Sequence, residues 1–228
     1  MRQIAVLGMG RFGATIAKTL TKKGVEVIAI DNKNERIEEI KDYVAVAVAL
    51  DATDEKALRA VGLENVDVAI VCMGEDVEAN LLTTTLLKKM GIKKVYARAM
   101  TALQEEILKS IEVTKVLNLE EEMGVMVANS VAAAGVEKHM VLAPNHSLVE
   151  LRVPKSFISK TVREVATRQK YKVNIVAIKK KVPQVTELGE RIFKEVLNDV
   201  PQPDDVFEEG DMLMVVGSDA NIESLTKL

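Results

Sequence analysis

The feature that most restricts the fold of this chain is a glycine-rich segment, GMGRFG at residues 8–13, which follows a short apolar run. Gly8, Gly10 and Gly13 have the spacing of a turn that leads from a buried strand into a helix. The first glycine permits the tight turn, the second lets a pyrophosphate approach the backbone, and the third allows close packing of helix on strand. Free N–H groups at the start of such a helix attract phosphate. The segment therefore predicts a nucleotide-binding turn.

Six apolar runs rich in β-branched residues occur in the first 119 residues, separated by helix-like stretches. The runs are continuous rather than alternating, which is typical of strands buried on both faces of a parallel sheet. The predicted strands cover residues 4–8, 25–31, 44–50, 66–72, 94–99 and 114–119, and the predicted helices cover 12–23, 34–42, 54–61, 76–90, 102–110 and 120–138. This alternation predicts an α/β domain with a Rossmann-like, doubly wound parallel sheet.

The pattern changes after the predicted helix at 120–138. Pro144 and Asn145 indicate a turn and a domain boundary. We therefore expect a nucleotide-binding domain at residues 1–140 and a second, smaller α+β domain at residues 141–228. In the second domain we predict strands at 147–153, 173–178 and 211–217, helices at 159–169 (with Ser159 as the N-cap) and 218–228, and a short helix at 189–198.

Candidate ligand-binding side chains follow the predicted strands. Asp31 ends the second strand, where a carboxylate can accept hydrogen bonds from ribose hydroxyls. We note no arginine near Asp31 to receive a 2′-phosphate, which argues against NADP. Asp51 and Thr53 follow the third strand, although Thr53 could instead cap the next helix. Gly74 follows the fourth strand and Arg98 ends the fifth, and carboxyl ends of parallel strands meet at one edge of the sheet.

Arg11, inside the glycine turn, favours an anionic ligand. Its guanidinium can bind a terminal phosphate, whereas without a partner its charge opposes the helix dipole at a cost of a few tenths of a kcal/mol. The alternative interpretation is a solvated side chain at the start of the helix.

Composition and charge exclude several other classes of protein. A net charge of −3 and only 3% aromatic residues give no reason to expect nucleic acid as a partner. No apolar stretch reaches the roughly 20 residues of a membrane span, and no signal peptide is recognised, so we expect a cytoplasmic protein. The single cysteine, Cys72, lies in an apolar run and is expected to be an inert buried thiol.

An NAD-dependent oxidoreductase with a Rossmann domain is the main alternative. Such an enzyme needs a proton donor and a substrate domain. His139 and His146 flank the predicted linker, and Tyr43 and Tyr96 have no lysine at a suggestive spacing. A P-loop for ATP hydrolysis and a DNA-binding helical domain are also not recognised. We therefore predict a nucleotide sensor and not an enzyme.

The quoted motifs together resemble the RCK family, the KtrA/TrkA-type cytosolic regulators of potassium channels and transporters. Residues 147–225, from SLVELRVP to EEGDMLMVVGSDANIESL, are similar to the RCK C-terminal (TrkA-C) domain of this family. The N-terminal resemblance rests on GMGRFG (8–13), DNK (31–33), ALDATD (49–54), VCMGED (71–76), YARAM (96–100) and LEEEMG (119–124).

This resemblance implies a regulatory ligand in the Rossmann domain: ATP or ADP, or else NAD(H). It implies that Arg11 contacts the terminal phosphate, which favours ATP/ADP. It also implies that Glu120 helps to hold a divalent cation such as Mg²⁺ near the phosphates, at the interface of a dimer. Dipole complementarity at a helix start is the alternative explanation of Glu120. The implied ligand-binding residues are Gly8, Gly10, Arg11, Phe12, Gly13, Asp31, Asn32, Lys33, Asp51, Ala52, Thr53, Met73, Gly74, Arg98 and Glu120.

The resemblance also implies partners. Chains of this family pair and assemble into an octameric ring under a membrane-embedded potassium-conducting subunit, which associates the ring peripherally with the membrane. The residues at helical spacing in the helix at 120–138 form either a core stripe or a face that packs on a partner subunit; they are Met123, Met126, Val127, Ser130, Ala133 and Ala134. Residues 181–207 are longer than the corresponding family segment, which leaves open whether a second effector, such as a cyclic dinucleotide, binds there.

Overall fold

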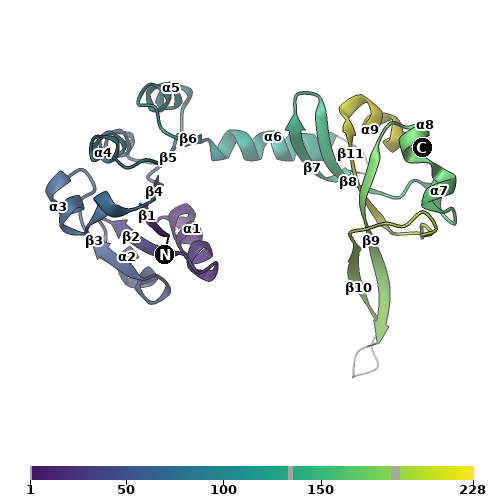
Figure 1. Cartoon of the computed structure of the whole chain (residues 1–228), viewed down its shortest axis with the longest axis horizontal. Helices are drawn as coiled ribbons and strands as arrows, with labels where there is room; N and C mark the ends of the chain where they lie inside the picture. Colours follow the sequence, from purple (N-terminus) through teal and green to yellow (C-terminus); the bar gives the residue numbers. More distant parts are fainter. Residues whose placement is uncertain (1, 133–135, 186–190) are drawn as a thin grey trace. The chain divides into compact units, whose positions relative to one another are not determined.

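The computed structural model describes residues 2–132, 136–185 and 191–228 of the 228-residue chain (Figure 1). The chain divides into two compact units, Met1–Glu122 and Met123–Leu228. Each unit has its own buried core and is described separately below.

The first unit is built on six parallel strands in the order β3-β2-β1-β4-β5-β6 (Figure 1). The predicted Rossmann-like sheet is therefore confirmed. The chain adds β2 and β3 on one side of β1 and then β4, β5 and β6 on the other, so the strand order reverses between β1 and β4. This is the position where doubly wound sheets bind ligands. The strands are β1 (Gln3–Leu7), β2 (Glu26–Asp31), β3 (Val46–Ala49), β4 (Val68–Val71), β5 (Val95–Arg98) and β6 (Lys115–Leu117).

Helices cover both faces of this sheet, because alternate residues of each strand point to opposite sides. Ile4 and Val6 of β1 pack in one core cluster with residues of α1 and α2, whereas Ala5 and Leu7 pack in another with residues of α3, α4 and α5. The helices are α1 (Arg11–Lys22), α2 (Asn34–Ile40), α3 (Glu55–Ala60), α4 (Val77–Lys89), α5 (Ala102–Ser110) and α6 (Leu119–Ala132).

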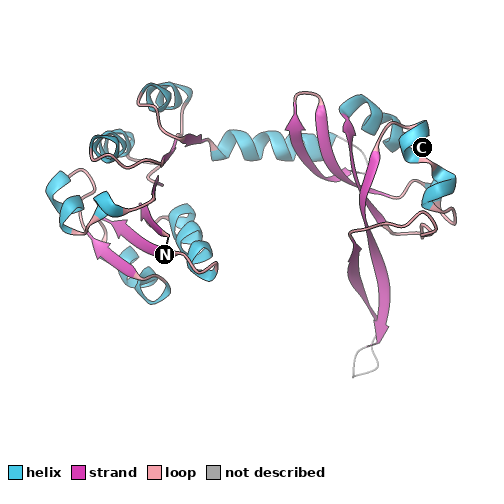
Figure 2. Ribbon diagram, viewed as in Figure 1, coloured by secondary structure: helices cyan, strands magenta, loops and turns pink. Residues whose placement is uncertain are grey.

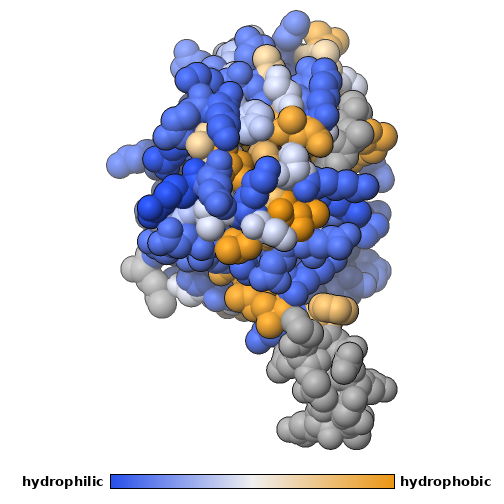
Figure 3. Space-filling model, turned by 90° about the vertical axis from the view of Figure 1, so that its right-hand side faces the viewer, coloured by the Kyte–Doolittle hydropathy of each residue, from blue (hydrophilic) through white to orange (hydrophobic). Residues whose placement is uncertain are grey.

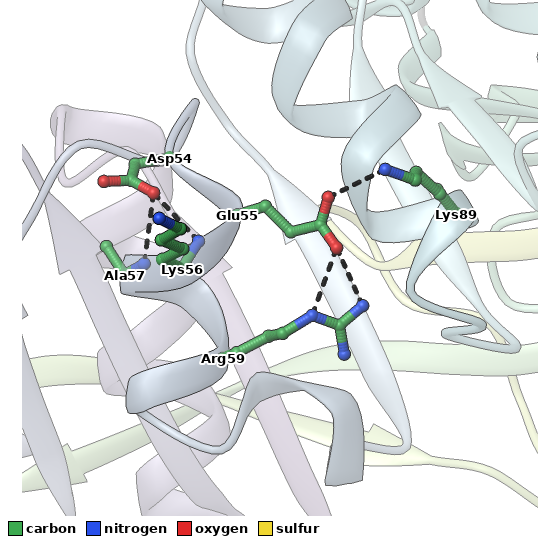
Figure 4. A network of polar contacts seen from close by, with 6 residues as sticks. All are labelled: Asp54, Glu55, Lys56, Ala57, Arg59 and Lys89. Carbon is green, nitrogen blue, oxygen red and sulfur yellow. Dashed lines mark hydrogen bonds and ion pairs between the residues drawn. The ribbon is translucent and has the colours of Figure 1, made fainter.

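Polar side chains cap the starts of α3, α4 and α5. Asp54 caps α3 by accepting a hydrogen bond from the Lys56 amide at 2.8 Å. In the next position, Glu55 accepts from Arg59 of the same helix at 2.8 Å and from Lys89 of α4 at 2.9 Å (Figure 4). The ion pair to Lys89 joins α3 to α4 and is exposed to solvent, so water and salt screen it and it contributes little to stability.

The second unit contains a five-stranded antiparallel sheet in the order β10-β9-β11-β8-β7 (Figure 2). Its core contains Phe157, Phe207, Leu213 and Leu225, all nearly or fully buried. On the face that Figure 3 shows, hydrophilic side chains dominate and the apolar ones form small patches. The predicted α+β architecture is confirmed. The elements are β7 (Val136–Ala143), β8 (His146–Arg152), α7 (Val162–Val165), α8 (Thr167–Lys170), β9 (Asn174–Val185), β10 (Arg191–Asn198), β11 (Met212–Ser218) and α9 (Asp219–Thr226).

The short helix predicted at 189–198 is wrong. Residues 191–198 form β10, an antiparallel partner of β9, in a register that runs from Arg191 opposite Val185 to Asn198 opposite Ile178. Eight consecutive cross-strand pairs outweigh the local preference of the segment for a helix. Residues 186–190 lie outside the described residues.

The helix predicted at 159–169 is interrupted, and its predicted N-cap is wrong. Ser159 has a φ of 64°, and the N-cap is Thr161, which forms a capping box with Glu164. Ala166 adopts a left-handed conformation with a φ of 51°, so the segment divides into α7 and α8.

The region between the two predicted domains also differs from expectation. Helix α6 ends at Ala132, and residues 136–138 belong to β7 instead of to the predicted helix; residues 133–135 lie outside the described residues. Pro144 and Asn145 form the turn between β7 and β8, where Asn145 has a φ of 60°. The predicted boundary between residues 140 and 141 falls inside β7, and the whole of this strand pairs with β8 of the second unit. The two compact units divide instead between Glu122 and Met123, inside α6.

Candidate nucleotide-binding site

A pocket of about 760 Å³ opens in the first unit at the carboxyl ends of the parallel strands. The glycine turn after β1 and the residues that follow β2, β3, β4 and β5 form its wall. All the binding residues expected from the sequence line this pocket except Gly13 and Glu120. The topology of the sheet brings these residues together although they are up to 90 positions apart along the chain.

The glycine turn has the geometry that its spacing predicts. Gly8 has a φ of 97°, which disfavours any residue with a side chain. A Cβ on Gly13 would lie 1.9 Å from the Gly8 carbonyl oxygen, so helix α1 approaches the strand too closely for even a methyl group. A Cβ on Gly10 would meet no atom within 4 Å, so the space in front of Gly10 is open. Gly10 is also the N-cap of α1, and it has no side chain that could accept a hydrogen bond from the first N–H groups of the helix. These N–H groups are therefore available to a phosphate.

Asp31, at the end of β2, is buried and held by the protein itself. Its Oδ2 atom accepts hydrogen bonds from the Met9 amide at 2.6 Å and from Arg36 Nη1 at 3.2 Å, and its Oδ1 atom accepts from the Lys33 amide at 2.9 Å. A carboxylate offers about four acceptor positions, so about one remains, on Oδ1. That position can accept a hydrogen bond from a ribose hydroxyl.

The salt bridge between Arg36 and Asp31 corrects one inference from the sequence. Arg36 lies in the first turn of α2, lines the pocket and contacts Asp31, so the argument that no arginine lies near Asp31 is wrong. Arg36 is only five residues after Asp31 in the sequence, and the first turn of α2 brings its side chain back to the end of β2.

Asp51 and Thr53 form a compact turn at the end of β3. The Asp51 carboxylate accepts from the Thr53 amide at 2.8 Å and from the Thr53 hydroxyl at 2.7 Å, and these two bonds lower the pKa of Asp51. Asp54, and not Thr53, caps α3. Thr83 of α4 donates a hydrogen bond to the Ala52 carbonyl at 3.0 Å and so fixes this turn against the pocket wall.

Two arginines occupy the other side of the pocket. Arg11, the first residue of α1, is exposed, and no carboxylate lies within ion-pair distance of it among the residues that the structure describes. Arg98 lies with its Cζ atom 5.8 Å from the centre of the Phe12 ring. A Cβ on Gly74 would lie 3.0 Å from Arg98 Nη1. The Arg98 guanidinium therefore lies between the start of α1 and the end of β4.

Glu120, the expected metal ligand, contacts Arg98. Its Oε1 atom lies 2.5 Å from Arg98 Nη2. The pKa of Glu120 is lowered, first by a hydrogen bond from its own backbone amide and then by Arg98. In the described ranges no group of three His, Cys, Asp or Glu side chains could hold a metal. The expected site differs from such a group, because one carboxylate and the phosphates of a nucleotide would hold the cation, so the Mg²⁺ site at Glu120 stays a prediction.

Cys72 is buried at the end of β4, and this desolvation raises the pKa of its thiol to about 12 although Arg98 opposes the shift. The predicted burial of Cys72 is confirmed, and its raised pKa supports the prediction of an inert thiol. His139 and His146 belong to the second unit, whereas every residue that lines the pocket belongs to the first unit. His139 Nε2 lies 2.7 Å from the Ser147 hydroxyl.

The described residues of the apolar stripe on α6 are exposed and belong to none of the buried core clusters. Met123, Met126 and Val127 are 52%, 44% and 54% exposed. Ser130 has no described side chain, and Ala133 and Ala134 lie outside the described residues.

Sequence reasoning missed several residues of the pocket wall. Glu75 and Asp76 directly follow Gly74 and Leu119 directly precedes Glu120, so their positions next to predicted residues were a usable signal. Thr83 lies inside α4 and had no such signal.

Within the part of the chain that the structure describes, no helix has both the length and the apolarity that crossing a bilayer requires.

Comparisons with known proteins agree with this architecture. Residues 4–119 match the family model of the TrkA-N domain, and residues 148–228 match that of the TrkA-C domain. Ktr system potassium uptake protein C of Bacillus subtilis (strain 168) is 33% identical over 226 residues, which are 99% of this chain and 96% of that protein. Ktr system potassium uptake protein A of the same organism is 32% identical over 222 residues, with coverages of 97% and 94%.

A solved structure described as the GsuK channel bound to NAD is similar in fold. It superimposes with a TM-score of 0.53 at 21% identity, and the match covers 100% of this chain but 38% of the channel chain. At this identity the likeness concerns the fold alone.

Proposed function

Since this chain belongs to the family defined by a TrkA-N domain followed by a TrkA-C domain, we propose that it is a regulatory subunit of a potassium uptake system and senses an adenine nucleotide. Two relatives that it matches over nearly their whole length are named as potassium uptake proteins. The proposal places the chain in the cytoplasm, attached to the membrane through its transporter partner.

The observation that carries the proposal is the pocket at the carboxyl ends of the strands. It combines open space in front of Gly10, at the free start of α1, with a ribose acceptor on Asp31. These are the parts needed for the phosphate and the sugar of a nucleotide. Asp51 and Thr53 close the side of the pocket beyond Asp31, where a base would lie.

ATP and ADP are the ligands we favour, with NAD(H) as the alternative. Arg11 is exposed at the start of α1 and free of carboxylate partners among the described residues, so its guanidinium is available to a terminal phosphate. A dinucleotide would place a second ribose and a nicotinamide on that side. The alternative is supported by the similar fold of the structure described as the GsuK channel bound to NAD.

The proposed signal is a shift between conformations and not a chemical reaction. ATP and ADP differ by one phosphate, so a contact that only ATP makes favours one conformation over another. A tenfold preference corresponds to about 1.4 kcal/mol, which a single charge-assisted hydrogen bond can supply. The chain itself would only bind and orient the nucleotide.

Assembly is a further part of the proposal. We expect pairs of chains to form an octameric ring on a membrane-embedded potassium-conducting subunit, as the family resemblance implies. The exposed Met123, Met126 and Val127 of α6 support a contact with a second copy of the chain.

A thermal-shift panel tests the proposed ligand class. ATP, ADP, NAD and NADH are each added to the purified full chain, because a ligand raises the melting temperature in proportion to the logarithm of its excess over Kd. We expect the largest rise with ATP or ADP and no consumption of any of the four. An unchanged melting temperature with all four, or rapid turnover of one, would refute the proposal.

A further inference from the structure

The Arg98 side chain can contact either of two anionic groups. Its guanidinium lines the pocket beside Phe12, the second residue of α1, and beside Gly74. Phosphates bind at the start of such a helix, so a bound nucleotide would bring negative charge next to this guanidinium. The Arg98 side chain is 19% exposed, and its buried Nε atom has no hydrogen-bond partner among the residues that the structure describes.

The second anion is the Glu120 carboxylate. It belongs to the first turn of α6, is 54% exposed and does not line the pocket. An ion pair with so exposed a carboxylate is weak because water and salt screen it. A phosphate can accept two parallel hydrogen bonds from a guanidinium, whereas Glu120 Oε1 accepts from Nη2 alone, so a phosphate can replace the carboxylate.

We propose that the Arg98–Glu120 ion pair is a latch that the phosphates of a bound nucleotide open. Arg98 exchanges the carboxylate for a phosphate, and Glu120, with the first turn of α6, is released from the end of β5. The inference rests on the proposed function, since it requires a nucleotide in the pocket. Nucleotide binding would thus act directly on α6, the helix in which the first compact unit ends.

The latch and a cation site at Glu120 predict opposite effects of the Glu120→Gln substitution on nucleotide affinity. If Glu120 competes with phosphate for Arg98, Glu120→Gln removes the competitor and the nucleotide binds more tightly. If Glu120 holds a cation against the phosphates, the same substitution weakens binding when Mg²⁺ is present.

Calorimetric titration of the full-length chain with ADP and with ATP, in EDTA and again in Mg²⁺, separates these cases. Glu122→Gln is the matched control, because it removes the same charge from the first turn of α6 at a carboxylate whose described partner is Lys115, 3.9 Å away. We expect Glu120→Gln to bind both nucleotides about three- to fivefold more tightly than the control in both buffers. In an Arg98→Ala background the advantage over the control should disappear.

Hydrogen exchange tests the release of α6. In the unmodified chain, ADP should speed exchange of the backbone amides of residues 123–126. In Glu120→Gln these amides should already exchange at the faster rate without ADP, and ADP should change them little.

The remaining outcomes each decide the question. Equal affinities of Glu120→Gln and Glu122→Gln, or unchanged exchange in α6, would overturn the latch and leave the proposed function standing. Weaker binding of Glu120→Gln in Mg²⁺ would replace the latch with a cation ligand. Absence of binding by the unmodified chain would remove the proposed function and the latch together.

Discussion

The backbone amide of Met9 donates a 2.6 Å hydrogen bond to the carboxylate of Asp31, and this bond joins the glycine turn to the end of β2. Arg36 holds the same carboxylate oxygen from α2. Two segments of the pocket wall are thus fixed to one another before any ligand arrives, so little reorganisation is required on binding.

Replacing Asp31 should therefore affect both binding and stability. Asp31→Ala removes the ribose acceptor and leaves the buried Met9 amide without a partner, at a cost of about 2 kcal/mol. We expect undetectable ADP binding by calorimetry and a matching loss in urea unfolding. The control is Asp67→Ala, whose carboxylate accepts the Gln3 amide at the opposite end of the sheet and does not line the pocket. Equal effects of the two variants on ADP binding would contradict the role of Asp31.

Arg11 should discriminate between nucleotides by their terminal phosphate. Arg11→Ala is expected to weaken ATP binding about ten- to hundredfold, the value of a hydrogen bond to a charged group, and to change ADP binding far less. Arg59→Ala is a suitable control, since Arg59 pairs with Glu55 on α3 and does not line the pocket. Equal losses for ATP and ADP would rule out a contact with the terminal phosphate.

Two glycines of the turn should fail in different ways when changed to alanine. Gly13→Ala places a methyl group 1.9 Å from the Gly8 oxygen, so unfolding free energy should fall by about 3 kcal/mol or more. Gly10→Ala meets no protein atom within 4 Å, so stability should change little, while the methyl group occupies the space in front of the free amides of α1. Denaturant unfolding and ADP titration of both variants measure the contrast. Retained ADP affinity in Gly10→Ala would show that the phosphates lie elsewhere.

Glu150 of β8 should make the stability of the second unit depend on pH. Burial alone would raise the pKa of Glu150, but hydrogen bonds from Lys179 and Lys138 outweigh it and hold this pKa below 4.5. A depressed pKa stabilises the folded state fully above pH 4.5, and this stabilisation is lost as the pH falls through the lower folded value.

Comparison of Glu150→Gln with the unmodified chain tests this dependence. The variant should be about 2 kcal/mol less stable at pH 7, because the partly buried Lys179 loses its close charge partner and keeps only the exposed Glu195 carboxylate, 3.7 Å away. The difference should shrink below pH 4. Urea unfolding followed by circular dichroism at several pH values measures it, and Glu223→Gln, in an exposed pair with Lys227, serves as the control. A difference that stays constant down to pH 2 would contradict the ion-pair explanation.

The first unit could be predicted from the sequence because its signals are local. Continuous apolar runs identify strands with two covered faces, and the glycine spacing identifies the turn after β1. The strand ends then locate Asp31, Asp51 and Arg98 at one edge, where the structure places them. Arg36 was missed because its contact depends on the direction of a helix and not on a motif.

The second unit and α6 show where such signals end. Residues 191–198 become a strand through pairing with β9, an interaction between segments that no local propensity encodes. The stripe of Met123 and Met126 has the period of a helix face, and periodicity does not tell a face that packs within the chain from one that is exposed. Glu120 was assigned from the family resemblance, and its pairing with Arg98 depends on side-chain geometry.

The burial of Cys72 also bears on how the molecule can be handled in the laboratory. Cys72, the one cysteine of the chain, is 6% exposed and its thiol has a pKa of about 12. We therefore expect maleimides and other alkylating reagents to react little with it at neutral pH. A cysteine introduced at a surface position would then be the sole attachment point for a fluorophore or spin label. The chain can be labelled without first removing its own sulfhydryl.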